Sequence, residues 1–122
     1  MRIAIVDDEK IICEQIKDFI QKEHGDCQID SYFSGQAFLE AGKQFDLVFL
    51  DIQMEGMDGM ETARRCRKLA FNKMLVFFSS SRDYVFDAYD VEAFHYLVKP
   101  VDQGKLRNVL KRVMERERQV SQ

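Results

Sequence analysis

Short apolar runs recur along the chain, and a stretch with helical spacing follows each of them. The runs that we expect to form strands are residues 3–6, 27–33, 47–50, 75–78 and 95–98. The second run is the weakest, because polar residues interrupt it. Continuous apolar character is typical of strands buried on both faces of a parallel sheet, whose crossover connections are usually helices. The pattern therefore predicts one α/β domain over residues 1–122, a doubly wound five-stranded parallel sheet with helices on both faces.

The segments between these runs carry apolar residues every three or four positions, the spacing of a helix with one buried face. The first helix is expected to end at Gly25, and Ser34 and Gly42 are expected to cap a short second helix. The other expected helices are one that follows the loop 56–59 and carries Met60, Ala63 and Cys66, a short one at 83–92, and a final one carrying Leu106, Val109, Leu110, Val113 and Met114.

Polar residues stand where four of the expected strands end. Asp7 and Asp8 follow the first apolar run, Asp51 follows the third, Ser79 follows the fourth and Lys99 follows the fifth. Ligands of open parallel sheets bind at the carboxyl edge, where these strand ends meet. We therefore expect three carboxylates, a hydroxyl and an ammonium to converge on one small site.

Three carboxylates at one edge repel one another, since two unit charges about 4 Å apart cost roughly 4 kcal/mol at an effective dielectric constant near 20. Mg²⁺ suits such a site because it prefers oxygen ligands and shares its shell with phosphate. Calcium fits less well, because the chain has no loop of alternating aspartates. With metal and ammonium neutralising a phosphoryl group, Asp51, which stands alone, is the best nucleophile. In the alternative interpretation, these aspartates are merely turn residues that end strands.

Composition excludes several classes of protein. The net charge of −3 and pI near 5.4 argue against a nucleic-acid binder by charge alone. No apolar stretch of 18 residues occurs, so we expect no membrane span. The three cysteines are widely spaced without a CxxC motif, which favours reduced thiols in the cytoplasm over a disulfide or zinc site. Neither His24 nor His95 is expected to have a functional role.

The residues around the polar positions resemble the receiver domain of bacterial two-component response regulators, over essentially the whole chain. The matching segments are residues 6–9, 50–54, 56–61, 77–79 and 96–100. Residues 89–101 are similar to receivers attached to LytTR-type DNA-binding domains. The resemblance implies the flavodoxin-like strand order 2-1-3-4-5.

For the site, the resemblance implies a phosphoacceptor, Asp51, that a sensor histidine kinase phosphorylates with the help of Mg²⁺. Asp8 would be the main metal ligand, Asp7 would assist it directly or through water, and Asp51 and the main-chain carbonyl of Gln53 would complete the set. Lys99 would pair with Asp51 and then with the phosphoryl group. Ser79 would be the hydroxyl switch residue and Tyr96 the aromatic one. The peptide bond before Pro100 would be cis.

The resemblance also implies a cytoplasmic phosphoacceptor that assists its own phosphotransfer and dephosphorylation, rather than an enzyme. It would form a homodimer on phosphorylation and would control transcription through a DNA-binding output domain absent from this chain, with no membrane partner. A stand-alone receiver, or a pseudo-receiver that only binds protein partners, is the alternative. The complete set of Asp8, Asp51 and Lys99 argues against a pseudo-receiver.

Two positions depart from the family pattern. Glu55 replaces the usual proline after Met54, and its carboxylate either weakens metal binding or points to solvent. Ser79 replaces the commoner threonine and is followed by two more serines, so the register of the switch residue could differ by one.

Two rival classes lack their own motifs here. A flavodoxin-like cofactor carrier needs a phosphate loop rich in glycine and hydroxyl groups after the first strand, where this chain has residues 7–9, all acidic. A haloacid-dehalogenase-type phosphatase needs a second aspartate two residues after the nucleophile, where this chain has Gln53.

Overall fold

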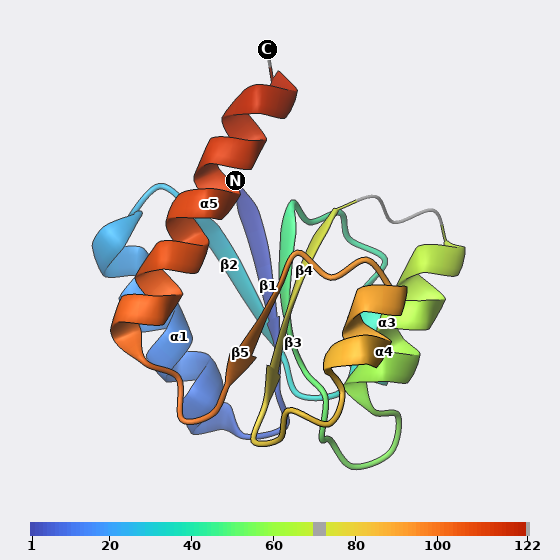
Figure 1. Cartoon of the computed structure of the whole chain (residues 1–122). Helices are drawn as coiled ribbons and strands as arrows, with labels where there is room; N and C mark the ends of the chain where they lie inside the picture. Colours follow the sequence, from blue (N-terminus) through green and yellow to red (C-terminus); the bar gives the residue numbers. More distant parts are fainter. Residues whose placement is uncertain (70–72, 122) are drawn as a thin grey trace.

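The computed structural model describes residues 1–69 and 73–121, in which five parallel strands form one sheet in the order β2-β1-β3-β4-β5 (Figure 1). This arrangement confirms the predicted fold class and strand order. The strands are β1 (Arg2–Val6), β2 (Gln28–Tyr32), β3 (Leu47–Asp51), β4 (Met74–Ser79) and β5 (His95–Val98).

Helices cover both faces of the sheet. They are α1 (Lys10–Glu23), α2 (Gly35–Ala41), α3 (Gly59–Lys68), α4 (Val85–Asp90) and α5 (Gln103–Ser121). Figure 1 shows α1 and α5 on one face and α3 and α4 on the other, and Phe38 joins α2 to the core cluster of the second face. Among the described residues, no helix combines the length and apolar composition that crossing a membrane would require.

Successive residues of the central strands enter opposite core clusters. Ile5 and Phe49 pack with α1 and α5, whereas Val6 and Leu50 pack with the helices of the other face. A strand whose two faces are both buried has no position for an exposed polar residue, and this explains its continuous apolar sequence. Polar residues can therefore appear only where these strands end.

Local hydrogen bonds set several helix boundaries. Ser34 caps α2 as predicted, accepting from the amide of Ala37 at 3.0 Å, and Gly42 ends that helix with a φ of 61°. The first helix ends at Glu23 with His24 as its C-terminal cap, and Gly25, which was predicted to stop the helix, follows directly. The fourth helix is shorter than the predicted range 83–92, because Asp83 lies in a turn where its amide donates to the Ser81 hydroxyl at 3.0 Å.

A long-range contact fixes the C-terminal end of α4. The guanidinium of Arg67, in α3, donates to the main-chain carbonyls of Val91 and Glu92 at 2.9 and 3.0 Å, and to that of Lys73 at 2.9 Å. Glu92 has a left-handed φ of 59°, which turns the chain towards β5. Burial lowers the pKa of Arg67, but the hydrogen bonds to these described carbonyls compensate for it. Arg67 therefore ties α3, α4 and the start of β4 together.

Replacing Gly59 with alanine should destabilise the fold. Gly59 lies against the end of β3, so an added Cβ would overlap the Asp51 carbonyl oxygen and lie 2.7 Å from the Ile52 Cα, both main-chain atoms. We expect a loss of about 1–3 kcal/mol in the free energy of unfolding, measured by urea denaturation. The control is Gly104→Ala in α5, where the Cβ would lie 3.1 Å from a movable carboxylate oxygen of Asp102. An equal loss in both variants would contradict this explanation.

Candidate functional site

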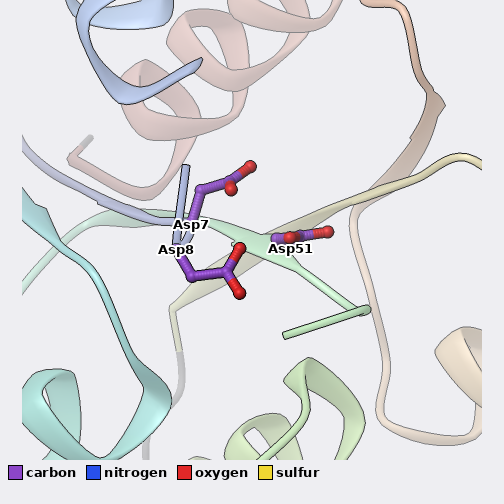
Figure 2. Close-up of side chains that lie close together, drawn as sticks. All are labelled: Asp7, Asp8 and Asp51. Atoms are coloured by element: carbon purple, nitrogen blue, oxygen red, sulfur yellow. The ribbon is translucent and has the colours of Figure 1, made fainter. Parts of the chain in front are cut away.

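Three aspartates come together at the carboxyl edge of the sheet. Figure 2 shows Asp7 and Asp8, directly after β1, standing beside Asp51 at the end of β3. Each offers one carboxylate oxygen, and these oxygens all lie within 4.8 Å of one another. Asp7 and Asp51 are buried, with exposed fractions of 0% and 2%, whereas Asp8 is exposed. The cluster therefore has an open side at Asp8.

Lys99 is the cation that faces the buried aspartates. Its Nζ lies 3.0 Å from Asp7 Oδ2, 3.3 Å from Asp51 Oδ1 and 4.0 Å from Glu9 Oε1. The Lys99 amide donates to the Ser79 carbonyl at 2.8 Å, which aligns the ends of β4 and β5, and the Lys99–Pro100 peptide bond is cis. The ammonium therefore bridges the loop after β1 and the end of β3.

Burial and charge shift the acid–base properties of the site. Burial, followed by the charge of Asp7, raises the pKa of Asp51 to about 6, although Lys99 and the Gln53 amide oppose this shift. Burial alone would lower the pKa of Lys99, but its hydrogen bond to Asp7 and the charges of Asp51 and Asp7 raise it above its usual value. Ionisation of Asp51 is therefore less favourable in the folded protein than in the unfolded chain.

The donor set fits a small, hard cation. Lys99 supplies one positive charge beside three aspartates, so two negative charges remain uncompensated when all three are ionised. The converging oxygens come from the loop after β1 and the end of β3, and their spacing within 4.8 Å allows one ion to contact several of them. Carboxylate oxygens and an open side are what a partly hydrated divalent cation requires.

Gln53 lies beside Asp51 on the loop after β3. Its amide donates to Asp51 Oδ1 at 3.3 Å, and its side-chain oxygen accepts a hydrogen bond from the Ser80 hydroxyl at 2.6 Å. The hydrogen bond to Ser80 links the loops that follow β3 and β4. The predicted role of the Gln53 carbonyl as a metal ligand stays a prediction.

Ser79 and Tyr96 meet at the loop after β4. Ser79 is wholly buried, and its hydroxyl accepts from the Ser81 amide at 3.1 Å, whereas Ser80 is exposed. The half-buried Tyr96 donates its hydroxyl to the Ser81 carbonyl at 2.6 Å, and burial raises its pKa. Of the consecutive serines, Ser79 is thus the one buried at the end of its strand.

The histidines and cysteines lie outside this cluster. His95 is in β5, with Nδ1 2.9 Å from the Tyr96 amide, and His24 caps α1. The three cysteines are free and buried, and burial raises the pKa of the Cys13 and Cys66 thiols to about 11.

Glu9 and Glu55 make contacts at the site that were not predicted from the sequence. Glu9 lies 4.0 Å from Lys99, and the main-chain amide of Glu55 donates to Asp8 Oδ2 at 3.2 Å. The acidic run at residues 7–9 was a signal for the first contact. The second involves a main-chain donor, whose only sequence signal was the absence of proline at position 55.

A comparison with family models matches residues 3–111 to the response regulator receiver domain. The chain belongs to this family. The receiver is 26% identical to the sensory transduction protein LytT of Bacillus subtilis over 114 residues, which is 92% of the chain and 47% of LytT. It is 27% identical over 117 residues to the transcriptional regulatory protein YpdB of Escherichia coli K12, covering 93% of the chain and 47% of YpdB. The receiver thus spans about half the length of these relatives.

A solved structure extends the likeness to the fold. The response regulator TrrA of Thermotoga maritima, crystallised in complex with Mg²⁺ and beryllofluoride, is 32% identical to this receiver, with a TM-score of 0.81 over 92% of this chain and 97% of that one. The chain is accordingly a receiver domain of the two-component response regulators.

Replacing Asp51 with asparagine should stabilise the receiver in the absence of metal. A buried carboxyl whose pKa rises from 3.8 to about 6 on folding favours the protonated folded state, so its contribution to stability is present below pH 4 and lost as the pH rises to 6. Asparagine does not ionise, so the variant does not lose stability in this way as the pH rises. We expect its advantage in the free energy of unfolding to be small at pH 4 and about 1–3 kcal/mol at pH 7, measured by urea denaturation.

The matched control is Asp46→Asn, just before the opposite end of β3, where the half-buried side chain accepts from the Arg2 amide. It should not reproduce this pH dependence. A stability difference between Asp51→Asn and wild type that does not change from pH 4 to 7 would contradict the assignment.

Proposed function

We propose that this receiver accepts one phosphoryl group on Asp51 from a sensor histidine kinase and changes conformation in response. The observation that carries the proposal is the clustering of Asp51 with Asp7, Asp8 and Lys99 within hydrogen-bonding or metal-ligating distance. The direct test is Mg²⁺-dependent uptake of one phosphoryl group from a small phosphodonor, measured by intact mass.

In the proposed transfer, an Asp51 carboxylate oxygen attacks the phosphorus of a phosphohistidine. The new oxygen–phosphorus bond makes an acyl phosphate, the phosphorus–nitrogen bond breaks, and the kinase imidazole leaves with the bonding electrons and takes up a proton. Lys99, now 3.3 Å from Asp51, would then bind a phosphoryl oxygen. The receiver is a phosphoacceptor that assists its own phosphotransfer and dephosphorylation, and it does not act on a separate substrate.

Mg²⁺ is the cation that we propose for the acidic cluster. Asp8 and Asp7 would hold it together with Asp51 and the Gln53 carbonyl, and the bound ion would neutralise the charge of the phosphoryl oxygens. Two observations support the choice: the three converging carboxylates and the Mg²⁺–beryllofluoride complex of TrrA.

We further propose that a longer protein carries this receiver together with a LytTR-type output domain and works in the cytoplasm. DNA would be bound only through that output domain, as a dimer that forms on phosphorylation. The transcriptional regulatory protein YpdB, of which the chain matches 47%, supports this proposal. A stand-alone receiver would instead function without an output domain. A pseudo-receiver would take up no phosphoryl group.

Binding of the phosphoryl mimic beryllofluoride should move Ser79 and Tyr96 together. A new acceptor at Asp51 would attract the buried Ser79 hydroxyl, which now accepts from Ser81, the same residue that Tyr96 contacts. Arg67 holds the C-terminal end of α4, so the N-terminal end of α4 is freer to shift. We expect amide chemical-shift changes throughout residues 83–98 and on α5. The exposed Phe86 and Tyr89 of α4 favour self-association through this face.

Ser79→Ala is the control for this prediction. It should retain the beryllofluoride-induced shifts around Asp51 but lose most of those in residues 83–98. Shifts confined to the Asp51 pocket of the wild-type protein would contradict the switch, even with phosphorylation confirmed.

A further inference from the structure

A main-chain amide holds the one exposed carboxylate of the aspartate cluster. Glu55, on the loop after β3, donates its N–H to Asp8 Oδ2 at 3.2 Å. Asp8 belongs to the loop after β1, 47 residues away in the chain. The hydrogen bond therefore spans the acidic cluster from one loop to the other.

The other two aspartates of the cluster are held by a different group, the ammonium of Lys99. Lys99 contacts Asp7 and Asp51, which are both buried. The described ion pairs of Lys99 do not include Asp8. Because the Asp8 side chain is exposed, it can rotate unless another group holds it. The Glu55 amide is the donor that the structure places on this carboxylate.

A hydrogen bond to one oxygen is compatible with a metal on the other. A carboxylate has two oxygens and about four acceptor positions, and the amide uses a position on Oδ2. Hydrogen-bonded partners of a metal-ligating carboxylate fix its orientation, and removing such partners typically weakens metal binding. The contact also involves an ionised acceptor, which strengthens it relative to a neutral hydrogen bond.

We propose that the Glu55 main-chain amide is a positioning group for the divalent cation: it orients Asp8 so that its other oxygen faces the ion. The proposal rests on the function proposed above. It also separates the two parts of this residue, since the amide favours metal binding whereas the exposed carboxylate contributes only a screened charge.

Proline at position 55 tests the amide directly, because proline lacks the N–H donor. Glu55 is not among the described residues with positive φ, so its φ has the negative sign that proline also requires. Glu55→Ala is the matched control, which removes the carboxylate and keeps the amide. We expect the Mg²⁺ dissociation constant of Glu55→Pro to be about 3- to 10-fold higher than that of Glu55→Ala, measured by NMR titration. Glu55→Ala itself should stay within about twofold of wild type.

Amide hydrogen exchange gives a second readout that does not depend on the proline variant folding. The Glu55 amide should be protected in the wild-type protein both with and without Mg²⁺, and Asp8→Ala should abolish the protection. Loss of protection on adding Mg²⁺ would mean that the amide competes with the ion, and it would overturn the proposal. Equal Mg²⁺ affinities of the proline and alanine variants would overturn it too, while leaving the proposed function intact. A wild-type protein that binds no Mg²⁺ would overturn both.

Discussion

Asp51→Asn should abolish phosphoryl uptake. Wild-type receiver incubated with a small phosphodonor and Mg²⁺ is expected to gain the mass of one phosphoryl group, whereas the variant should gain none. Asparagine keeps the size and most contacts of the buried side chain but is a far weaker nucleophile, because its amide carries no negative charge. Intact-mass spectrometry measures both proteins, and omission of Mg²⁺ should suppress uptake by the wild type.

The matched control is Asp46→Asn, the same substitution just before the opposite end of β3, which should be phosphorylated like the wild type. Stability measurements accompany the experiment, because Asp51→Asn is expected to be the more stable protein at neutral pH. Its failure to react could then not be attributed to unfolding. Full modification of Asp51→Asn would show that another residue accepts the phosphoryl group.

Alanine substitutions of Asp8 and Lys99 should separate metal binding from the conformational response. Asp8→Ala removes a carboxylate from the converging cluster, so we expect Mg²⁺ affinity to fall by at least about tenfold and phosphorylation to fall with it. Lys99→Ala removes the cation 3.0 Å from Asp7 and 3.3 Å from Asp51. Its Mg²⁺ affinity should equal or exceed that of the wild type, because a competing positive charge is gone.

Lys99→Ala is also expected to accept beryllofluoride or a phosphoryl group without the chemical-shift changes in residues 83–98. Without Mg²⁺ it should be less stable than the wild type at pH 7, since two buried carboxylates lose their counterion, and Mg²⁺ should restore much of this loss. Lys105→Ala, at an exposed position of α5, serves as the control for loss of a lysine. Equal loss of Mg²⁺ binding in the Asp8 and Lys99 variants would refute this division of roles.

Much of the fold was readable from local patterns. The strands at 3–6 and 75–78 lie within β1 and β4, because burial on both faces imposes continuous apolar sequence. Helix boundaries were less predictable. The end of α4 depends on a guanidinium from α3 and a left-handed residue, Glu92, and neither belongs to the periodicity of the helix itself.

The membership of the aspartate cluster was also predictable, since parallel strands bring their carboxyl ends to one edge. Asp7, Asp8 and Asp51 were recognised because each stands where the apolar run of a buried strand ends. The pairing inside the cluster was not predictable. Lys99 was expected to pair with Asp51, yet its shortest contact is to Asp7, because the packing of three strand ends sets these distances.

Main-chain donors were the hardest to anticipate. Every residue except proline carries an amide, so the sequence does not mark which amide will meet a carboxylate. The Glu55 amide reaches Asp8 only because the loops after β1 and β3 approach each other in the folded chain. Side-chain chemistry and strand order thus followed from periodicity and the direction of parallel strands, whereas the charge pairing at Lys99 and the orientation of Asp8 depended on loop geometry that only tertiary packing fixes.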